Sequence, residues 1–142
     1  MASGVIIAAH GEYAKGVKSG LDLVVGEMPN LRVVNFLEGD NYEVFDEALT
    51  KAYDELKEYD NTVFLTDLKG GTPFNRSAIL FGGNENVRVL SGLNFALVYQ
   101  ALISETSDIN EYVEEIIEAG KKSIDYFELP KEQEEQEETD GI

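Results

Sequence analysis

Short apolar runs recur along the chain and are separated by longer stretches in which apolar residues follow helical spacing. Residues 5–9 are nearly all apolar, and further apolar runs cover residues 31–37, 62–66 and 87–90. A nearly continuous run of this length is typical of a parallel strand that is covered on both faces. The pattern therefore predicts four strands at these positions.

Two amphipathic stretches between these runs predict helices. The first ends at Pro29 and Asn30, and its apolar stripe consists of Ala14, Val17, Leu21, Val24, Val25 and Met28. This spacing places the apolar side chains on one face of a helix. The second stretch opens with residues 40–43, in which Asp40 and Glu43 fit a capping box.

Three more helices are predicted farther along the chain. Pro73 indicates the start of one, residues 94–104 fit a short one, and Asp108 and Glu111 mark the start of the last. Strands and helices thus alternate, which is typical of the α/β class. We expect an open, mainly parallel sheet with strand order 2-1-3-4 and helices on both faces.

The chain of 142 residues fits one domain, and its end differs in composition from the rest. Residues 125–129 are a candidate for an extra C-terminal edge strand. Residues 131–142 hold six acidic side chains against one lysine, which accounts for −5 of the net charge of −17. We expect a domain over residues 1–130 and an acidic, disordered tail over residues 131–142.

The strong negative charge limits the partners. An acidic surface repels the phosphates of nucleic acids and anionic lipids, so neither is an expected partner. It suits a protein partner that has a basic docking face.

Other features indicate a cytoplasmic protein without disulfides. The chain has no cysteine, which excludes disulfides and thiolate metal sites. No run approaches the roughly 18 apolar residues of a membrane span, and the N-terminus lacks the basic segment of a secretory signal. No metal and no cofactor are predicted.

Candidate chemistry lies at the ends of the first and third strands. In open α/β sheets, ligands bind beyond the carboxyl ends of the strands, where the strand order reverses. His10, the only histidine, follows the first strand, and Asp67 follows the third. A lone histidine is more often structural than catalytic, but this location favours a function.

The segment after Asp67 has the features of an anion site. Gly70 and Gly71 allow the backbone to approach a ligand, and Pro73 suits the first position of a helix. Thr72 is then expected to be the N-cap residue. Together they would bind an anion at a helix N-terminus, although a plain strand-to-helix turn has a similar sequence.

These parts suggest histidine chemistry at a phosphoryl group. A carboxylate such as Asp67 can accept one ring N–H of His10, fix its tautomer and leave the other nitrogen as a nucleophile. Thr72 and nearby backbone N–H groups would hold the phosphoryl oxygens. The chain lacks a Walker-type phosphate loop, so a nucleotide is not the implied donor.

These residues resemble a known family. His10-Gly11 after the first strand, together with Asp67 and the string Gly70-Gly71-Thr72-Pro73-Phe74-Asn75, resembles the IIA component of the mannose family of bacterial sugar phosphotransferase systems. The resemblance covers roughly residues 4–128. It implies a transferase component in which His10 is phosphorylated, Asp67 binds the imidazole ring, and Thr72 lies at the phosphoryl group.

The resemblance also implies partners. The carrier HPr would donate the phosphoryl group, a IIB component would accept it, and a membrane IIC/IID complex would be an indirect partner. A homodimer is implied too, with residues 125–129 as a candidate interface strand. Lys69 stands where the family has a large aromatic or apolar residue, and Lys69, Phe74 and Asn75 are candidates for partner docking.

Other functions are weaker fits. The phosphocarrier domain of dihydroxyacetone kinase systems shares the fold and the histidine but lacks the glycine-pair string. A tetrapyrrole chelatase would need a second histidine, and a noncatalytic flavodoxin-like module would need a first loop rich in Ser and Thr. A receiver domain would need an acidic pair after the first strand. The sequence does not identify the sugar, because a IIA component does not touch it.

Overall fold

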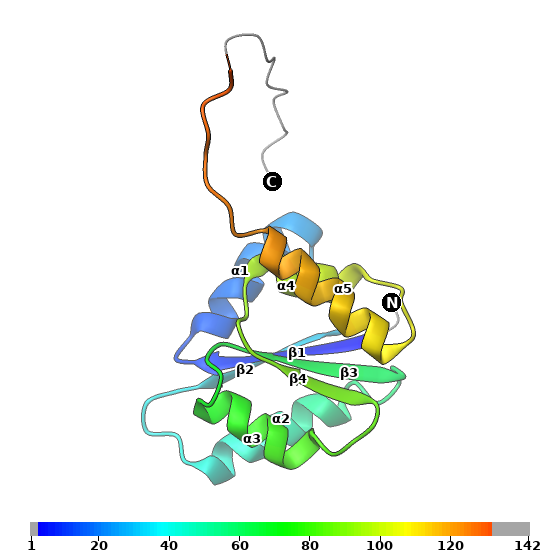
Figure 1. Ribbon diagram of the computed structural model, residues 1–142. Helices are drawn as coiled ribbons and strands as arrows, with labels where there is room; N and C mark the ends of the chain where they lie inside the picture. The colour runs from blue at the N-terminus through cyan, green and yellow to red at the C-terminus, as the bar shows by residue number, and fades with distance from the viewer. Residues whose placement is uncertain (1–2, 132–142) are drawn as a thin grey trace.

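A four-stranded parallel sheet forms the centre of the computed structural model, which describes residues 3–131 (Figure 1). The strand order is β2-β1-β3-β4. The strands are β1 (Ser3–His10), β2 (Leu31–Phe36), β3 (Asn61–Thr66) and β4 (Val87–Leu90). All three pairings are parallel. The predicted strands, their order and the α/β class are therefore confirmed.

Five helices cover the two faces of the sheet. Figure 1 shows α1 (Tyr13–Val25), α4 (Phe95–Ile103) and α5 (Ile109–Lys122) on one face. The other face carries α2 (Tyr42–Asp54) and α3 (Thr72–Phe81). This arrangement confirms the prediction of helices on both faces.

Successive side chains of the central strands pack on opposite faces of the sheet, which divides the core into two layers. Val5 and Ile7 of β1 pack with residues of α1, α4 and α5, whereas Ile6 and Ala8 pack with residues of α2. Successive side chains of a strand point to opposite faces, so β1 must be apolar at almost every position. This is why its run of apolar residues has no polar interruption.

Side-chain caps fix the starts of three helices. The side chains of Asn41, Asn94 and Asp108 accept hydrogen bonds from backbone N–H groups at the starts of α2, α4 and α5. The cap lies one residue beyond the Asp40 expected from the capping box at residues 40–43, and it accepts from Val44, so the box itself does not form. Asp40 instead accepts a hydrogen bond from the backbone N–H of Leu37 at 2.9 Å, and this turn leaves Asn41 as the cap.

The start of α3 also differs from the prediction. Gly71, not Thr72, is the N-cap residue, and no side chain caps this helix. Gly71 has extended backbone angles, and its carbonyl accepts a hydrogen bond from the N–H of Asn75 at 2.9 Å. Thr72 is therefore the first helical residue, so its hydroxyl is not used as the cap.

Residues 124–131 form no strand, so the expected extra edge strand is absent from the described part of this chain. The segment leaves the end of α5 and runs away from the sheet, where it has no neighbour for strand pairing (Figure 1). Its apolar side chains are largely exposed; they are Ile124, Tyr126, Phe127 and Leu129, at 72–83%. Of the expected tail, residues 132–142 lie outside the described residues.

Within residues 3–131, none of the helices has the length and apolar character needed to cross a membrane.

The caps of α2 and α4 generate a stability prediction. Asn41→Ala should lower the free energy of unfolding by about 1 kcal/mol, because one N-cap bond is lost at an exposed helix start. Asn94→Ala should cost about 2 kcal/mol, because the half-buried Asn94 side chain also donates to the carbonyl of Gly120 in α5 at 3.2 Å. Urea unfolding of both variants measures the difference. Equal losses would show that the link between α4 and α5 contributes nothing.

Candidate functional site

The carboxyl ends of β1 and β3 bring one histidine and one aspartate together. The two strands are neighbours, and Ala8 pairs with Thr66 in the register between them. His10 is the last residue of β1, and Asp67 directly follows β3. Both side chains thus lie at the carboxyl ends of the two central strands, between the N-termini of α1 and α3.

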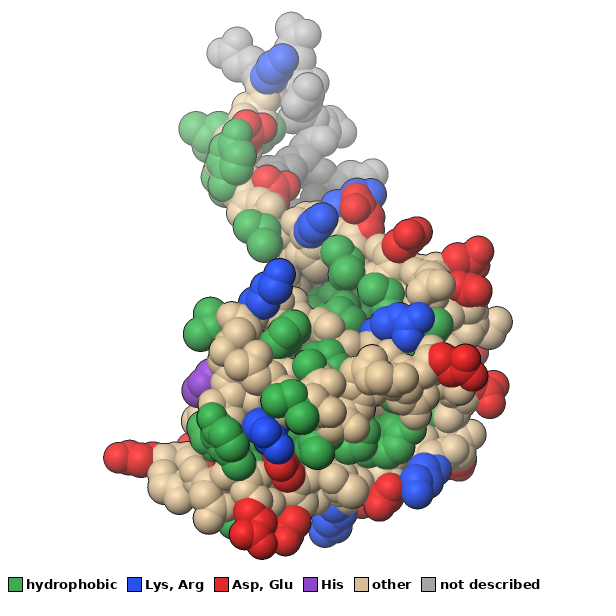
Figure 2. Space-filling model, turned by 60° about the horizontal axis from the view of Figure 1, so that its bottom comes forward, with side chains coloured by type: hydrophobic (Ala, Val, Ile, Leu, Met, Phe, Trp, Pro, Cys, Tyr) green, Lys and Arg blue, Asp and Glu red, His purple; other side chains and the backbone are tan. Residues whose placement is uncertain are grey.

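Asp67 accepts two hydrogen bonds from His10. Its Oδ2 atom lies 2.8 Å from Nδ1 of the imidazole and 3.0 Å from the backbone nitrogen of His10. A carboxylate can only accept, so Nδ1 carries the proton and Nε2 keeps a lone pair. The His10 side chain is 45% exposed, and the histidine is visible at the molecular surface in Figure 2. The arrangement therefore presents a nucleophilic nitrogen on a fixed ring.

The environment of Asp67 keeps this carboxyl ionised. Burial raises its pKa, but hydrogen bonds from the backbone and side chain of His10 and from the backbone of Leu68 outweigh it. The net effect places the pKa of Asp67 below its ordinary value of 3.8. At neutral pH, Asp67 is a negative charge beside the imidazole.

Phe36 supports the imidazole from β2. Its ring meets that of His10 edge to face, with centroids 6.0 Å apart and an angle of 81° between the planes. Phe45 of α2 packs on Phe36 in the same manner at 5.0 Å. The Phe36 carbonyl also accepts the N–H of Gly11 at 2.8 Å, where Gly11 turns the chain out of β1 with a φ of 58°.

The loop between Asp67 and α3 is held by its own hydrogen bonds. The N–H of Gly71 donates to the carbonyl of Leu68 at 3.0 Å, and the side-chain amide of Asn75 donates to the carbonyl of Gly70 at 2.9 Å. Gly70 has a φ of 82°, in the region that favours glycine. The Asn75 amide, expected to dock a partner, thus binds its own loop.

The other predicted site residues lie around this loop. Thr72 is half-buried at the start of α3, and Lys69 is exposed. Lys69 and Phe74 line one groove of about 390 Å³ together with residues of β4 and α5. Arg76 of α3, which is not one of these residues, forms an ion pair with Asp46 of α2.

The sequence interpretation missed the role of Phe36 beside the ring. A usable signal was present, because the apolar run over residues 31–37 ends level with the run that precedes His10. In the structure, His10 and Phe36 are register partners of β1 and β2.

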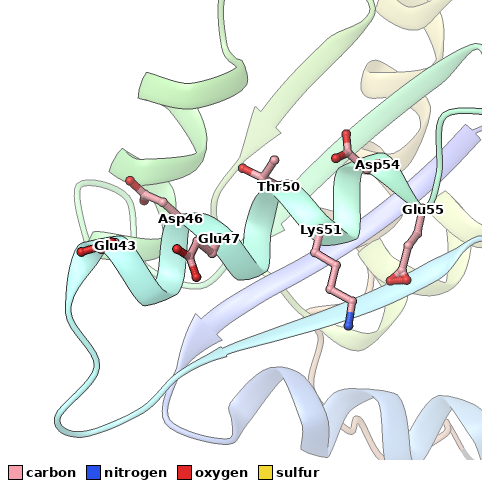
Figure 3. A pocket seen from close by; sticks show the side chains of 7 residues that line it. All are labelled: Glu43, Asp46, Glu47, Thr50, Lys51, Asp54 and Glu55. Atoms are coloured by element: carbon pink, nitrogen blue, oxygen red, sulfur yellow. The ribbon is translucent and has the colours of Figure 1, made fainter.

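A different hollow lies along α2, and His10 is not among the residues that line it. Figure 3 shows the side chains that line it, mainly acidic ones; they are Glu43, Asp46, Glu47, Thr50, Lys51, Asp54 and Glu55. None of them is a predicted site residue. Among the described residues, no three His, Asp or Glu side chains are grouped to hold a metal ion.

Comparison with known proteins finds related sequences and structures. Residues 4–117 match the model of the EIIA-man family, described as "PTS system fructose IIA component". The fructose-specific EIIA component of Bacillus subtilis (strain 168) is 29% identical over 98 residues, which cover 69% of this chain and 67% of that protein. The mannose-specific EIIAB component of Escherichia coli (strain K12) is 25% identical over 126 residues, which cover 87% of this chain and 39% of that protein.

Among solved structures, the phosphotransferase system component EIIA from Streptococcus agalactiae is similar, with a TM-score of 0.78 and 30% sequence identity. The match covers 87% of this chain and 96% of that chain. The similarity therefore extends over nearly all of the described sheet and helices.

The pair of His10 and Asp67 generates a pH prediction. In His10→Ala, the carboxyl of Asp67 loses its imidazole donor but keeps two backbone donors, so its pKa should rise relative to the wild type. A carboxyl with a lowered folded-state pKa stabilises the fold above its unfolded pKa, and this stability disappears as the pH falls through the folded pKa. The difference in Tm between wild type and variant should therefore shrink below about pH 4.

Carbon-13 NMR titration of the Asp67 carboxyl measures both pKa values directly. Identical titration curves in the two proteins would contradict the hydrogen bond between Nδ1 and Oδ2.

Proposed function

The chain belongs to the EIIA-man family of phosphotransferase-system components, and on this premise we propose that it accepts a phosphoryl group on His10 from the carrier HPr and passes it to a IIB component during sugar uptake. The observation that carries the proposal is the bond between Nδ1 of His10 and Oδ2 of Asp67. It leaves Nε2 as the one ring nitrogen with a lone pair.

The transfer follows from this tautomer. The Nε2 lone pair attacks phosphorus, and the bond between phosphorus and the donor breaks with its electron pair staying on the donor. The proton on Nδ1 remains in place, so the ring gains imidazolium character as the new bond forms. The carboxylate of Asp67, ionised at neutral pH, stabilises that positive charge. Transfer to IIB is the reverse reaction with a different partner.

The N-terminus of α3 supports the phosphoryl oxygens in this proposal. Helix N-termini carry free N–H groups and a partial positive charge, which favour an anion. Gly71 and Thr72 begin α3 without a side-chain cap. We assign phosphoryl binding to Gly70, Gly71 and Thr72, with the Thr72 hydroxyl as a further donor. Gly71 would line the site through its Cα, because its N–H is bonded to the Leu68 carbonyl.

The names of the relatives favour a role in a sugar phosphotransferase system, with HPr and IIB as partners, over a role in a dihydroxyacetone kinase system. Those names specify fructose, mannose and sorbose systems in different organisms. The shared element is a sugar phosphotransferase system, so the identity of the sugar is left open. Of the docking candidates, Lys69 is exposed, whereas Phe74 is half-buried and lines the groove beside β4.

We also propose a homodimer in which residues 125–129 cover the sheet edge of a second copy. β4 is an edge strand, so one side of its backbone has no strand neighbour in the described chain. The groove beside β4 is lined in part by Val89, Leu90, Val113 and Ile117. The exposed apolar side chains of residues 125–129 would fill such a groove, and their backbone would pair with β4.

The proposed domain boundaries rest on the family match over residues 4–117 and on the acidic composition from residue 131 onward. We propose residues 1–130 as the phosphocarrier domain, residues 131–142 as an acidic tail outside it, and a cytoplasmic location where HPr would be accessible.

His10→Ala should fold but accept no phosphoryl group, because the chain has no other histidine. Intact-mass measurement after incubation with phosphorylated HPr should show one acid-labile adduct on the wild type and none on the variant. Circular dichroism serves as the folding control. A wild-type level of adduct on the variant would refute the proposed function.

Tyr126→Ser and Phe127→Asp together should convert the dimer to a monomer, because they remove apolar area from the proposed interface segment. Sedimentation equilibrium measures the oligomeric state. Leu23→Ser, at an exposed apolar position of α1, is the matched control and should leave the dimer intact. A wild-type protein that is monomeric at micromolar concentration would contradict the dimer.

A further inference from the structure

A side chain at either of the two adjacent glycines before α3 would be unfavourable, and the reason differs between them. Gly70 has a φ of 82°, and a Cβ there would meet no atom within 4 Å. At Gly70, the obstacle to a side chain is therefore the backbone conformation and not a lack of space. Gly71 has a φ of −75° and a ψ of 168°, which any residue can adopt. At Gly71, the obstacle to a side chain is therefore the atoms that surround it.

The surroundings of Gly71 include the reactive ring. A Cβ at Gly71 would lie 2.9 Å from Cε1 of His10 and 3.1 Å from the carbonyl oxygen of Leu68. Both distances are shorter than ordinary van der Waals contact, so an added methyl group would be wedged between the two. The Leu68 carbonyl is held in place, because it accepts the N–H of Gly71 itself at 3.0 Å. The contact with Cε1 can therefore be relieved only if the imidazole and this loop move apart.

Moving the ring would disturb the bond that sets its tautomer. Cε1 is bonded to both Nδ1 and Nε2, so a displacement of Cε1 carries both nitrogens with it. Nδ1 is 2.8 Å from Asp67 Oδ2, a distance that leaves little room for a shift. Phe36 limits the ring from another direction through its edge-to-face contact.

We propose that Gly71 is a positioning residue for the reaction: its bare Cα forms the wall against which the His10 imidazole rests, with Nδ1 on Asp67 and Nε2 free. The effect of Gly71 on the transfer rate rests on the proposed function, whereas its effect on the ring does not. The position also explains how the transferred group would meet α3, because Nε2 is bonded to the same Cε1 that faces Gly71.

Nitrogen-15 NMR of the single histidine tests the proposal on the unphosphorylated protein. The wild type should show a protonated Nδ1 and an unprotonated Nε2 at a pH where the ring is neutral. Gly71→Ala should show a mixture of the two tautomers, and its initial rate of phosphoryl acceptance should fall about 10–100-fold. A merely structural role of Gly71 would lower the Tm without changing the tautomer.

Two glycine variants serve as controls. Gly16→Ala, at an exposed position of α1 with no atom within 4 Å of the added Cβ, should leave the tautomer and the rate unchanged. Gly70→Ala should lower the Tm through backbone strain but retain the Nδ1–H tautomer. A wild-type imidazole spectrum in Gly71→Ala would overturn the proposal.

A double-mutant cycle keeps the test decisive if Gly71→Ala folds poorly. With the ring removed in His10→Ala, the closest contact of the added methyl group is gone, so Gly71→Ala should lower the Tm less in that background than in the wild type. Equal losses in both backgrounds, or failure of the double variant to fold, would overturn the proposal. If instead the wild type accepts no phosphoryl group from phosphorylated HPr, the proposed function fails, while the NMR spectra and the cycle still decide the role of Gly71.

Discussion

The hydrogen bond between Nδ1 of His10 and Oδ2 of Asp67 is the constraint on which the site depends. It requires β1 and β3 to be neighbours with their carboxyl ends level, which the strand order and register provide. It also requires an ionised carboxyl, which the N–H donors of His10 and Leu68 maintain despite partial burial. The consequence is chemical: Nδ1 is bonded to Asp67, and Nε2 of the neutral ring keeps its lone pair.

Most of the architecture was predictable because local sequence and tertiary structure agree. The four apolar runs became strands within one or two residues of their predicted ends, since a strand buried on both faces has no alternative to apolar residues. The proximity of His10 and Asp67 could be expected from the strand order alone. Their roles in phosphoryl transfer, like that of Thr72, remain proposals.

The structure differs from the sequence-based predictions where the local backbone conformation depends on contacts between residues distant in sequence. The caps of α2 and α3 lie one residue from their predicted positions. The reason is that Asp40 and Gly71 form hydrogen bonds within turns that the sequence pattern does not reveal. The contact of Gly71 with the ring depends on the relative placement of β1 and α3, which no local pattern encodes. Residues 125–129 have a strand-like composition, yet within this chain they have no strand to pair with.

The tautomer of His10 connects the fold to the proposed reaction, and nitrogen-15 NMR of the phosphorylated protein tests it most directly. The chain has one histidine, so the spectrum has no overlap from other imidazoles. The account predicts that phosphorus is bonded to Nε2 and that Nδ1 retains its proton on Asp67. A phosphoryl group bonded to Nδ1 would contradict it.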